Sequence, residues 1–287
     1  MPQNNLKNIR KIMTLNKMKS LPSSLYTEEY FLTACEGYDV FIESEGQHLS
    51  RRLRDAFAVA EVEPGMRVLD VGCGRGEIIR HCMHLGVEVY GIDYAEVATL
   101  ITKDVIQAEK EMGQNDNNDL FLGAGVCRSD AKHLPFPGKY FDRVLLFDVV
   151  EHLYPWELRA ALLDTRRILK REGQIIIHTA PNRWYDTYAY PWVRLVRTLM
   201  GQGQFYPRDP RAITPVNQDV HVNEQDILSM RRTLQGVGFR NINVWLDSPP
   251  QNRNENVVLA ALRRIAFDIP PFRWFFEREL FAVAQNQ

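Results

Sequence analysis

The sequence has few cysteines, and none of them belongs to a recognisable metal or disulfide motif. Cys35, Cys73, Cys82 and Cys127 are scattered along 287 residues, and no two of them form a Cys-x-x-Cys pair. No cysteine and histidine share the spacing of a zinc site. This pattern is typical of reduced thiols and indicates a cytoplasmic protein.

An excess of charge of one sign and long hydrophobic runs are lacking as well. The 35 Lys and Arg nearly balance the 36 Asp and Glu, so the formal net charge is −1 and nothing draws the whole chain toward nucleic acid. No apolar run approaches the roughly 20 residues that a membrane-spanning helix needs. A hydrophobic fraction of 45% is instead typical of a globular protein with its own core.

Acidic residues are missing from the first 27 positions, which carry only basic charge. The basic residues there are Lys7, Arg10, Lys11, Lys17 and Lys19. The segment lacks the apolar stretch of a signal peptide. We expect residues 1–24 to be a disordered leader and residues 25–287 to form a single domain. A membrane-surface or transit role for the leader is the alternative, and Met13 or Met18 could be the true start.

Short apolar runs that alternate with helical patterns dominate the middle of the chain. The runs predict strands at 66–71, 87–93, 141–148 and 174–179. Helical patterns lie between them at 77–85, 95–112 and 156–170. Strands alternating with helices predict parallel units with right-handed crossovers. The runs show no alternation of polar and apolar residues, which fits strands covered on both faces.

The remaining segments complete the predicted fold. A weaker strand pattern at 120–127, a strand at 240–246 and a closing strand at 279–284 bring the total to seven. The sequence thus predicts an α/β, Rossmann-like, mostly parallel seven-stranded sheet with helices on both faces. Other helices are expected in residues 25–60, where Leu49, Leu53, Phe57 and Ala60 recur at helical spacing, at 257–267, and after residue 223, with Asn223 as N-cap and Asp226 in the first turn. Insertions that could cap a site lie at about 181–222 and 250–278.

A glycine-rich turn follows the first strand of this pattern. Residues 68–76 read Val-Leu-Asp-Val-Gly-Cys-Gly-Arg-Gly. Glycines let backbone approach a ligand closely because no Cβ intervenes. A dinucleotide fingerprint would need a glycine at position 77, where Glu77 stands instead. An acid in the first helical turn opposes a pyrophosphate, so an NAD-dependent oxidoreductase or epimerase is the weaker hypothesis.

Residues 68–76 resemble the first motif of the class I S-adenosylmethionine-dependent methyltransferases. The resemblance implies that the turn holds the methionine end of the cofactor and that Asp70 helps to position it. Ser129-Asp130-Ala131 resembles the adenine-contact motif of this family, and residues 147–153 resemble its fourth motif, at the mouth of the site. The resemblance covers residues 50–180 well and residues 220–285 only in architecture.

Carboxylates at strand ends support the same hypothesis. Asp93 ends the second strand, where a carboxylate can accept both ribose hydroxyls, and Tyr94 could lie on the adenine. The predicted S-adenosyl-L-methionine site comprises Asp70, Gly72, Cys73, Gly74, Gly76, Asp93, Tyr94, Asp130, Ala131 and Asp148. Because these residues retain the acids of a working site, a catalytically inactive methyltransferase-like partner protein is the less favoured alternative.

Three histidines are candidates for the chemistry at the acceptor. Methyl transfer from a sulfonium is an in-line displacement, for which the protein aligns a nucleophile, often with a base. Histidine is the usual base near neutral pH. We predict His152 and His221 as catalytic residues, although His152 could be a hydrogen-bonded structural residue and His221 a loop or capping residue. His178 lies inside a strand and is expected in the core.

Two adjacent residues are the remaining candidates for a metal site. Glu151 and His152 could in principle bind a divalent cation. Adjacent side chains on a helix do not face each other. We therefore predict no metal site.

The acceptor is expected to meet the parts of the chain that depart from the shared core. Residues 183–206 are rich in aromatic and basic side chains, and residues 267–276 add another apolar segment. A cap built from residues 183–211 could grip an anionic or sugar-bearing acceptor and be mobile without ligand. The alternatives are a small helical subdomain with its own core, or a membrane-surface segment at 189–200.

These features together lead to a prediction for function. We predict methyl transfer to a small-molecule, saccharide or lipid-linked acceptor at oxygen, with peripheral membrane contact as a possible property. Aromatic residues mixed with basic ones could also bind single-stranded nucleic acid. The balanced net charge makes nucleic acid the weaker partner hypothesis.

Overall fold

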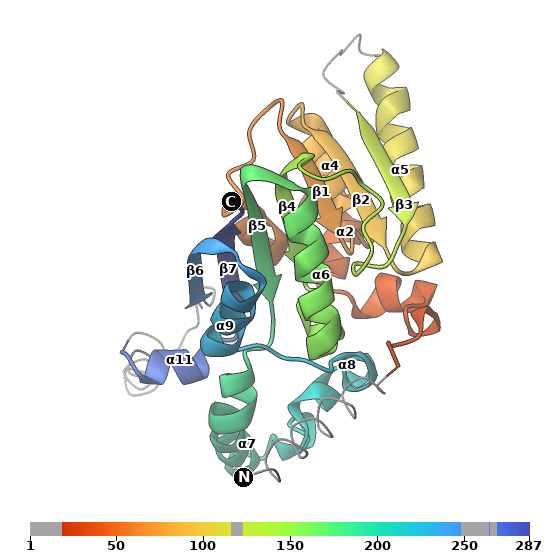
Figure 1. The fold of residues 1–287 in the computed structure, drawn as a ribbon. Coiled ribbons are helices and arrows are strands. Elements are labelled where there is room, and N and C mark those ends of the chain that lie inside the picture. The colour runs from red at the N-terminus through yellow and green to blue at the C-terminus, as the bar shows by residue number, and fades with distance from the viewer. Residues whose placement is uncertain (1–18, 116–122, 248–263, 265–268) are drawn as a thin grey trace, which may run out of the picture.

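A seven-stranded sheet with helices on both faces organises the protein. Figure 1 shows the computed structural model, which describes residues 19–115, 123–247, 264 and 269–287. The strand order is β3-β2-β1-β4-β5-β7-β6. The strands are β1 (Arg67–Val71), β2 (Glu88–Asp93), β3 (Ala124–Arg128), β4 (Phe141–Phe147), β5 (Leu169–Thr179), β6 (Arg240–Asp247) and β7 (Glu279–Gln285). The pairs from β3 to β5 are parallel, and β7 is antiparallel to both β5 and β6. The predicted sheet is confirmed.

The core lies on both sides of this sheet because successive strand residues point to opposite faces. Leu69 packs with α6 (Pro155–Ile168) and α9 (Ile227–Val237), whereas Val68 packs with α3 (Arg51–Ala58) and α4 (Glu77–His84). In Figure 1, α6 and α9 lie in front of the sheet and α4 lies behind it. Full burial of a leucine such as Leu145 contributes about 1.5–3 kcal/mol. Two covered faces explain why the strand runs lack polar alternation.

Several helices begin or end at residues other than those predicted, because tertiary contacts override the local sequence pattern. The helix predicted to reach residue 170 ends at Ile168, since Leu169 is extended and pairs with Phe141 across the sheet. Asp226, and not Asn223, is the N-cap of α9, because its Oδ1 accepts a hydrogen bond from the Ser229 amide at 2.8 Å. The prediction of Asn223 as N-cap was wrong.

The segment that precedes β1 packs at the edge of the sheet where the parallel strands end. It comprises η1 (Ser23–Leu25), η2 (Tyr30–Ala34), α2 (Tyr38–Glu43) and α3. Phe57 and Ala60 are buried against α4, and Leu49 and Leu53 pack beside them, as the helical spacing predicted. Most of the predicted leader, residues 1–18, lies outside the described residues.

Helices also follow the parallel part of the sheet. Between β5 and α9 the chain forms η4 (Tyr185–Ala189), α7 (Tyr190–Leu199), the 3-10 turns η5 (Gly203–Phe205) and η6 (Pro210–Ile213), and α8 (Pro215–Val220). On the other flank, α5 (Glu96–Asn115) packs on β2 and β3, and α11 (Phe272–Phe276) precedes β7. The helix predicted at 257–267 lies outside the described residues, apart from Arg264. No helix in the described part of the chain is long and apolar enough to cross a bilayer.

Candidate functional site

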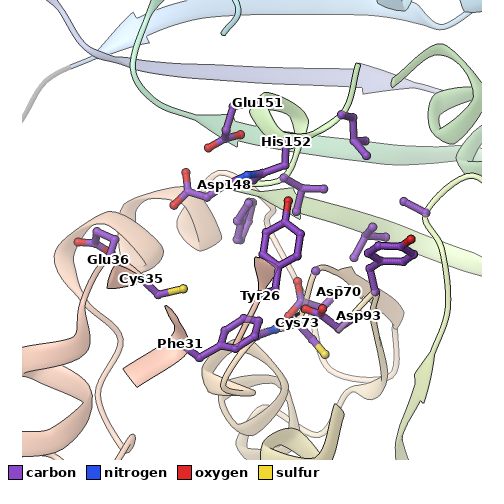
Figure 2. A pocket seen from close by; sticks show the side chains of 18 of the residues that line it. Tyr26, Phe31, Cys35, Glu36, Asp70, Cys73, Asp93, Asp148, Glu151 and His152 are labelled. Carbon is purple, nitrogen blue, oxygen red and sulfur yellow. Dashed lines mark hydrogen bonds between the residues drawn. The ribbon is translucent and has the colours of Figure 1, made fainter. Parts of the chain in front are cut away.

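A cavity of about 470 Å³ opens at the carboxyl ends of the parallel strands. Its floor carries Asp70 near the end of β1, Asp93 at the end of β2 and Asp148 directly after β4. Figure 2 shows Tyr26 and Phe31 of the N-terminal segment facing these acids across the cavity. The sequence predicted the floor, because carboxyl ends of parallel strands meet at one edge. The wall formed by residues 20–36 was not predicted.

The turn between β1 and α4 contains three glycines because its backbone has positive φ values. Gly72, Gly74 and Gly76 have φ values of 80°, 51° and 81°, a region that side chains rarely tolerate. A Cβ on Gly72 would lie 2.5 Å from Cγ2 of Val149. The Gly72 and Cys73 amides donate to the Ile92 carbonyl at 2.8 and 3.0 Å, which holds the turn against β2.

Two buried acids lie beside this turn. Asp93 Oδ2 accepts the Gly74 amide at 3.1 Å, and its Oδ1 accepts the Ala95 amide at 2.8 Å. Burial raises the pKa of Asp93 to about 6, although these backbone hydrogen bonds oppose the shift. Burial, reinforced by Asp93 and Glu77, raises the pKa of Asp70 to about 8. Such a pair of buried carboxyls suits a ligand that brings positive charge and hydroxyl donors.

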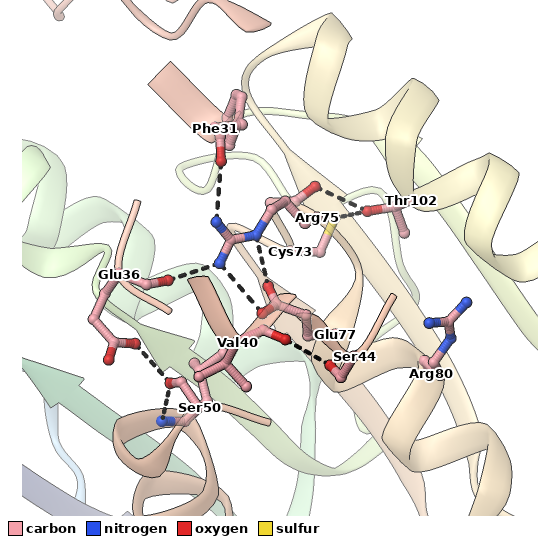
Figure 3. A network of polar contacts seen from close by, with 12 residues as sticks. Phe31, Glu36, Val40, Ser44, Ser50, Cys73, Arg75, Glu77, Arg80 and Thr102 are labelled. Carbon is pink, nitrogen blue, oxygen red and sulfur yellow. Dashed lines mark hydrogen bonds and ion pairs between the residues drawn. The ribbon is translucent and has the colours of Figure 1, made fainter. Parts of the chain in front are cut away.

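Arg75 is the partner of Glu77, the acid that follows the glycine turn. Its Nε donates to Glu77 at 3.0 Å, and both side chains are buried. The same guanidinium donates to the carbonyls of Phe31 at 3.0 Å and Glu36 at 2.7 Å (Figure 3). Arg75 therefore fastens the N-terminal wall to the glycine turn. We missed this role, for which the only sequence signal is an arginine two residues before an acid.

Residues of the predicted adenine region also line the cavity. Tyr94, Asp130 and Ala131 all face it, at its end nearest β2 and β3. Asp130 forms an ion pair with Lys132 at 2.8 Å, and Lys132 forms another with Glu157 at 2.7 Å. These contacts fix the loop that follows β3, and all three residues line the cavity.

Asp148 is held by two basic side chains that sequence reasoning did not connect with it. Its Oδ1 accepts Nη2 of Arg52 at 2.6 Å and lies 3.1 Å from Nδ1 of His178. Burial opposes ionisation, but Arg52 and His178 together hold the pKa of Asp148 well below its usual range. His178 is buried in β5, as predicted, and it also lies 3.6 Å from Glu279.

Glu151, His152 and His221 meet at the other end of the cavity. Each offers one possible ligand atom, and these atoms all lie within 4.8 Å of one another. The expectation that Glu151 and His152 do not converge was wrong. They belong to a single 3-10 turn, η3 (Val150–His152), and the amides of Val222 and Asn223 donate to the Glu151 carbonyl at 2.9 and 3.1 Å, bringing His221 alongside.

The protonation of the two histidines follows from their surroundings. His152 Nδ1 lies 3.1 Å from the Val220 carbonyl oxygen, which can only accept, so Nδ1 carries the proton and Nε2 carries the lone pair. Burial lowers the pKa of His152 to about 4 and that of His221 to about 3. Both imidazoles are therefore neutral at physiological pH. The His152 ring lies edge-on to Tyr26, with centroids 5.7 Å apart.

The predicted aromatic cap does not line this cavity. The residues of 181–222 that do so are Pro181, Thr214, Asn217 and His221. No residue of 183–206 lines it, so the expectation that these aromatics grip the acceptor there was wrong. Tyr190 is buried against Tyr185 and Tyr206 and donates its hydroxyl to the Pro207 carbonyl at 2.8 Å, whereas Trp184 and Tyr188 contact Phe275 of α11. This packing favours the alternative of a small helical subdomain.

Comparison with known proteins agrees with the geometry. Residues 69–177 match the family model described as a methyltransferase domain. A ubiquinone/menaquinone biosynthesis C-methyltransferase of Cupriavidus pinatubonensis is 24% identical over 225 residues, which cover 74% of this chain and 83% of that protein. The protein of that name from Bordetella parapertussis is 30% identical over 181 residues, covering 58% and 64%.

Solved structures share the fold. A methyltransferase from Archaeoglobus fulgidus, described as dependent on S-adenosylmethionine, superposes with a TM-score of 0.55 at 23% identity and covers 86% of this chain and 99% of that one. Phosphoethanolamine N-methyltransferase 2 of Haemonchus contortus, solved with S-adenosyl-L-methionine, gives 0.53 at 16% identity, covering 90% and 59%.

Residues 69–177 thus form a methyltransferase domain, and the fold is that of the class I S-adenosylmethionine-dependent methyltransferases. Its cofactor is therefore S-adenosyl-L-methionine, and the NAD-dependent hypothesis falls. The buried acids Asp70 and Asp93 are chemically compatible with this cofactor, whose sulfonium and ammonium carry positive charge and whose ribose carries two hydroxyl donors.

Proposed function

We propose that the protein methylates an oxygen of a hydroxylated small molecule that lies against Glu151, His152 and His221. The observation that carries this proposal is the neutral His152, whose Nδ1 is engaged by Val220 and whose Nε2 lone pair is left for the acceptor. The bound cofactor supplies an activated methyl group. The acceptor oxygen forms its bond to that carbon as the bond to sulfur breaks, and the hydroxyl proton passes to Nε2 of His152.

The cofactor residues predicted from sequence remain the proposed ones. Asp70 and the turn of Gly72, Cys73, Gly74 and Gly76 would hold the methionine end. Asp93 would accept the ribose hydroxyls, with Tyr94, Asp130 and Ala131 along the adenine. Asp148, fixed by Arg52, would stand between the cofactor and the acceptor. The residues of the chain thus orient both reactants and exclude water, which is most of what an in-line displacement requires.

We propose oxygen, in preference to carbon, as the methylated atom because of the residues at the acceptor end of the cavity. The similar proteins named above are C-methyltransferases by name, and carbon is the competing target. A pair of neutral imidazoles beside a carboxylate suits an acceptor that gives up a hydroxyl proton. His152 and His221 are accordingly the proposed catalytic residues.

An acceptor with an apolar part is favoured over a purely polar saccharide. The outer face of α7 exposes Trp192 and Leu199, whose exposed fractions are 67% and 80%. Residues 187–208 contain three arginines and no acid. An apolar stripe with basic neighbours is typical of helices that lie at a lipid surface, so we propose peripheral membrane contact and a lipid-soluble or lipid-linked acceptor.

Two measurements test the proposal. Isothermal titration should show binding of S-adenosylmethionine and of its demethylated product, with no comparable binding of NADH. Transfer of radiolabelled methyl from the cofactor to hydroxylated aromatic acceptors, followed by mass spectrometry of the product, should place the label on oxygen. Cofactor binding without transfer to any acceptor would instead favour the inactive-partner hypothesis, and label on carbon would contradict the choice of atom.

A further inference from the structure

His178 is fully buried in β5, with a carboxylate facing each of its two ring nitrogens. Its Nδ1 lies 3.1 Å from Oδ1 of Asp148, and its Nε2 lies 3.6 Å from Oε2 of Glu279. Asp148 lines the cavity, where Figure 2 shows it beside Glu151 and His152, whereas His178 and Glu279 do not line it. His178 can therefore act on a bound ligand through Asp148.

The backbone of His178 holds Asp148 as well. The Asp148 amide donates to the His178 carbonyl at 2.9 Å. Asp148 has a φ value of 55°, in the left-handed region that residues other than glycine seldom adopt. Such a conformation persists where the surrounding contacts impose it. The two contacts from His178 thus fix both the main chain and the carboxylate of Asp148.

We infer that His178 is a positioning residue that carries a proton on both ring nitrogens and holds the carboxylate of Asp148 so that Oδ2 faces the methionine end of the cofactor. Both flanking carboxylates are already paired as anions. Oδ1 of Asp148 accepts Nη2 of Arg52 at 2.6 Å. Oε1 of Glu279 accepts Nη2 of Arg51 at 2.5 Å. Since a carboxylate only accepts, a ring nitrogen that faces one with a lone pair would be repelled, so both nitrogens of His178 are donors.

The charges around His178 agree with a protonated ring. Burial lowers the pKa of His178, but Asp148 and Glu279 outweigh burial and raise that pKa above its usual value. The charged and titratable groups around His178 and Asp148 are Arg51 and Arg52 of α3, Glu151 and His152 of η3, and Glu279 of β7. Burial raises the pKa of Glu151 to about 8 and lowers that of His152 to about 4, so these two add little charge near neutral pH. The proton on His178 therefore offsets negative charge that would be costly to leave uncompensated.

The arrangement of donors leaves one oxygen of Asp148 for a ligand. Both Nη2 of Arg52 and Nδ1 of His178 bind Oδ1, so Oδ2 stays available on the cavity side. Val149, the next residue, packs against Gly72, where a Cβ would lie 2.5 Å from its Cγ2. Asp148 thus lies beside the turn proposed to hold the methionine end, whose ammonium can donate to a carboxylate oxygen. The inference rests on this proposed placement of the cofactor but not on the acceptor or the methylated atom.

Nitrogen-15 NMR of the full chain with labelled histidines tests the protonation. The His178 signal is the one lost in His178→Asn or, if that variant does not fold, in His178→Gln. At pH 7.5, where exposed histidines are mostly neutral, we expect its two ring nitrogens to have nearly equal shifts, as in a cation. His152 and His221, whose pKa values are lowered, should show the widely separated shifts of neutral rings. Separated shifts for His178 would overturn the inference.

Isothermal titration with two ligands tests the positioning. S-adenosylhomocysteine is the demethylated product, and 5′-methylthioadenosine keeps its adenine and ribose but lacks the amino-acid end. His178→Leu removes the donor to Asp148, so it should weaken S-adenosylhomocysteine by about 10-fold and change 5′-methylthioadenosine by less than about twofold. The amino-acid end carries one positive and one negative charge, so the loss reports the hydrogen bond and not net charge.

Two further variants complete the test. His178→Asn, whose amide can replace Nδ1 as the donor, should retain most of the affinity for S-adenosylhomocysteine. The matched control is His48→Leu, which removes an exposed histidine that does not line the cavity and should change neither affinity. Binding of 5′-methylthioadenosine shows that each variant is folded.

The outcomes separate this inference from the proposed function. An equal loss for both ligands in His178→Leu would mean that His178 only supports the fold, and an unchanged affinity for S-adenosylhomocysteine would mean that it does not position Asp148. Either result would overturn the inference alone. If the unaltered protein bound both ligands equally well, the proposed placement of the methionine end would be contradicted, and the inference with it.

Discussion

Arg75 and Glu77 form a buried ion pair in which Nε of Arg75 lies 3.0 Å from Oε2 of Glu77. The pair lies directly after the glycine turn, and the remaining donors of Arg75 hold the backbone of residues 31 and 36. A buried pair of this kind is costly to break from one side, because the partner keeps its charge without compensation.

We therefore expect Arg75→Met to lower the free energy of unfolding by about 3–5 kcal/mol. The variant should also weaken cofactor binding, because the wall of residues 20–36 loses its attachment to the turn. Thermal or urea unfolding and isothermal titration measure the two effects. Arg171→Met is the control, since the Arg171 side chain is 85% exposed and should contribute almost nothing. Equal stability of the two variants would contradict the role given to Arg75.

The glycine turn offers a comparison between two positions with the same backbone conformation. Gly72 and Gly65 have φ values of 80° and 83°, but a Cβ on Gly65 meets nothing within 4 Å, whereas one on Gly72 meets Val149 at 2.5 Å. Gly65→Ala should cost about 1–2 kcal/mol for the backbone alone. Gly72→Ala should cost about 1–3 kcal/mol more.

The second half of this prediction concerns the contact itself. Adding Val149→Ala to Gly72→Ala removes the obstructing methyl group. The double variant should recover part of the lost stability, measured as a coupling free energy in urea unfolding. Strictly additive effects would show that the clash with Val149 is not what constrains Gly72.

Asp93 should control cofactor affinity. Replacing it with alanine removes a buried acceptor of the ribose hydroxyls and is expected to weaken S-adenosylmethionine binding by about 10- to 100-fold. Isothermal titration provides the measurement. Asp104→Ala, which removes an exposed acid from α5, should leave the affinity unchanged. If both variants bind the cofactor as the parent does, Asp93 is not the ribose ligand.

The same carboxyl predicts a pH dependence. Because the pKa of Asp93 is raised to about 6, the group is ionised above that pH and protonated below it in the cofactor-free protein. A protonated carboxyl accepts hydroxyl donors poorly, so the dissociation constant should rise as the pH falls from 7 to 5. Asp93→Asn should bind weakly and lose this dependence. A slope below pH 6 that persists in Asp93→Asn would assign it to another group.

Hydrogen exchange should locate the part of the chain that responds to the cofactor. The N-terminal wall contributes Tyr26, Tyr30 and Phe31 to the cavity, and residues 183–206 contribute none. We expect the cofactor to slow exchange in residues 26–36 and to leave residues 187–200 little changed. Slower exchange in residues 187–200, without a change in residues 26–36, would instead support the aromatic insertion as the cap over the site.

Local patterns were sufficient to predict the sheet and the residues that line the cavity at its carboxyl edge. The turn with Gly72 and Gly76 and the acids at Asp70 and Asp93 depend on strand ends and backbone conformation, which neighbouring residues determine. The parts of the site that the sequence did not predict depend on tertiary contacts. His221 reaches Glu151 only because residues 222 and 223 bond to η3, about 70 positions earlier. No periodicity encodes that contact.

The sequence did not predict which way the side chains of the aromatic insertion face. Its composition correctly indicated a helical segment with apolar side chains, but composition does not say which way a helix faces. Tyr190 turned inward and Trp192 outward, away from the cavity. Orientation depends on what α7 packs against, and that is decided by residues such as Tyr206 and Pro207, which follow later in the chain.

The antiparallel strand β7 has a consequence for how the protein is assembled. It lies between β5 and β6, and its first residue, Glu279, forms an ion pair with Arg51 of α3, 228 positions earlier. β7 therefore completes the sheet and fixes the helix that precedes the glycine turn. The cofactor end of the site cannot be fully supported before β7 has been synthesised, so the nascent protein should acquire cofactor affinity only once β7 has left the ribosome.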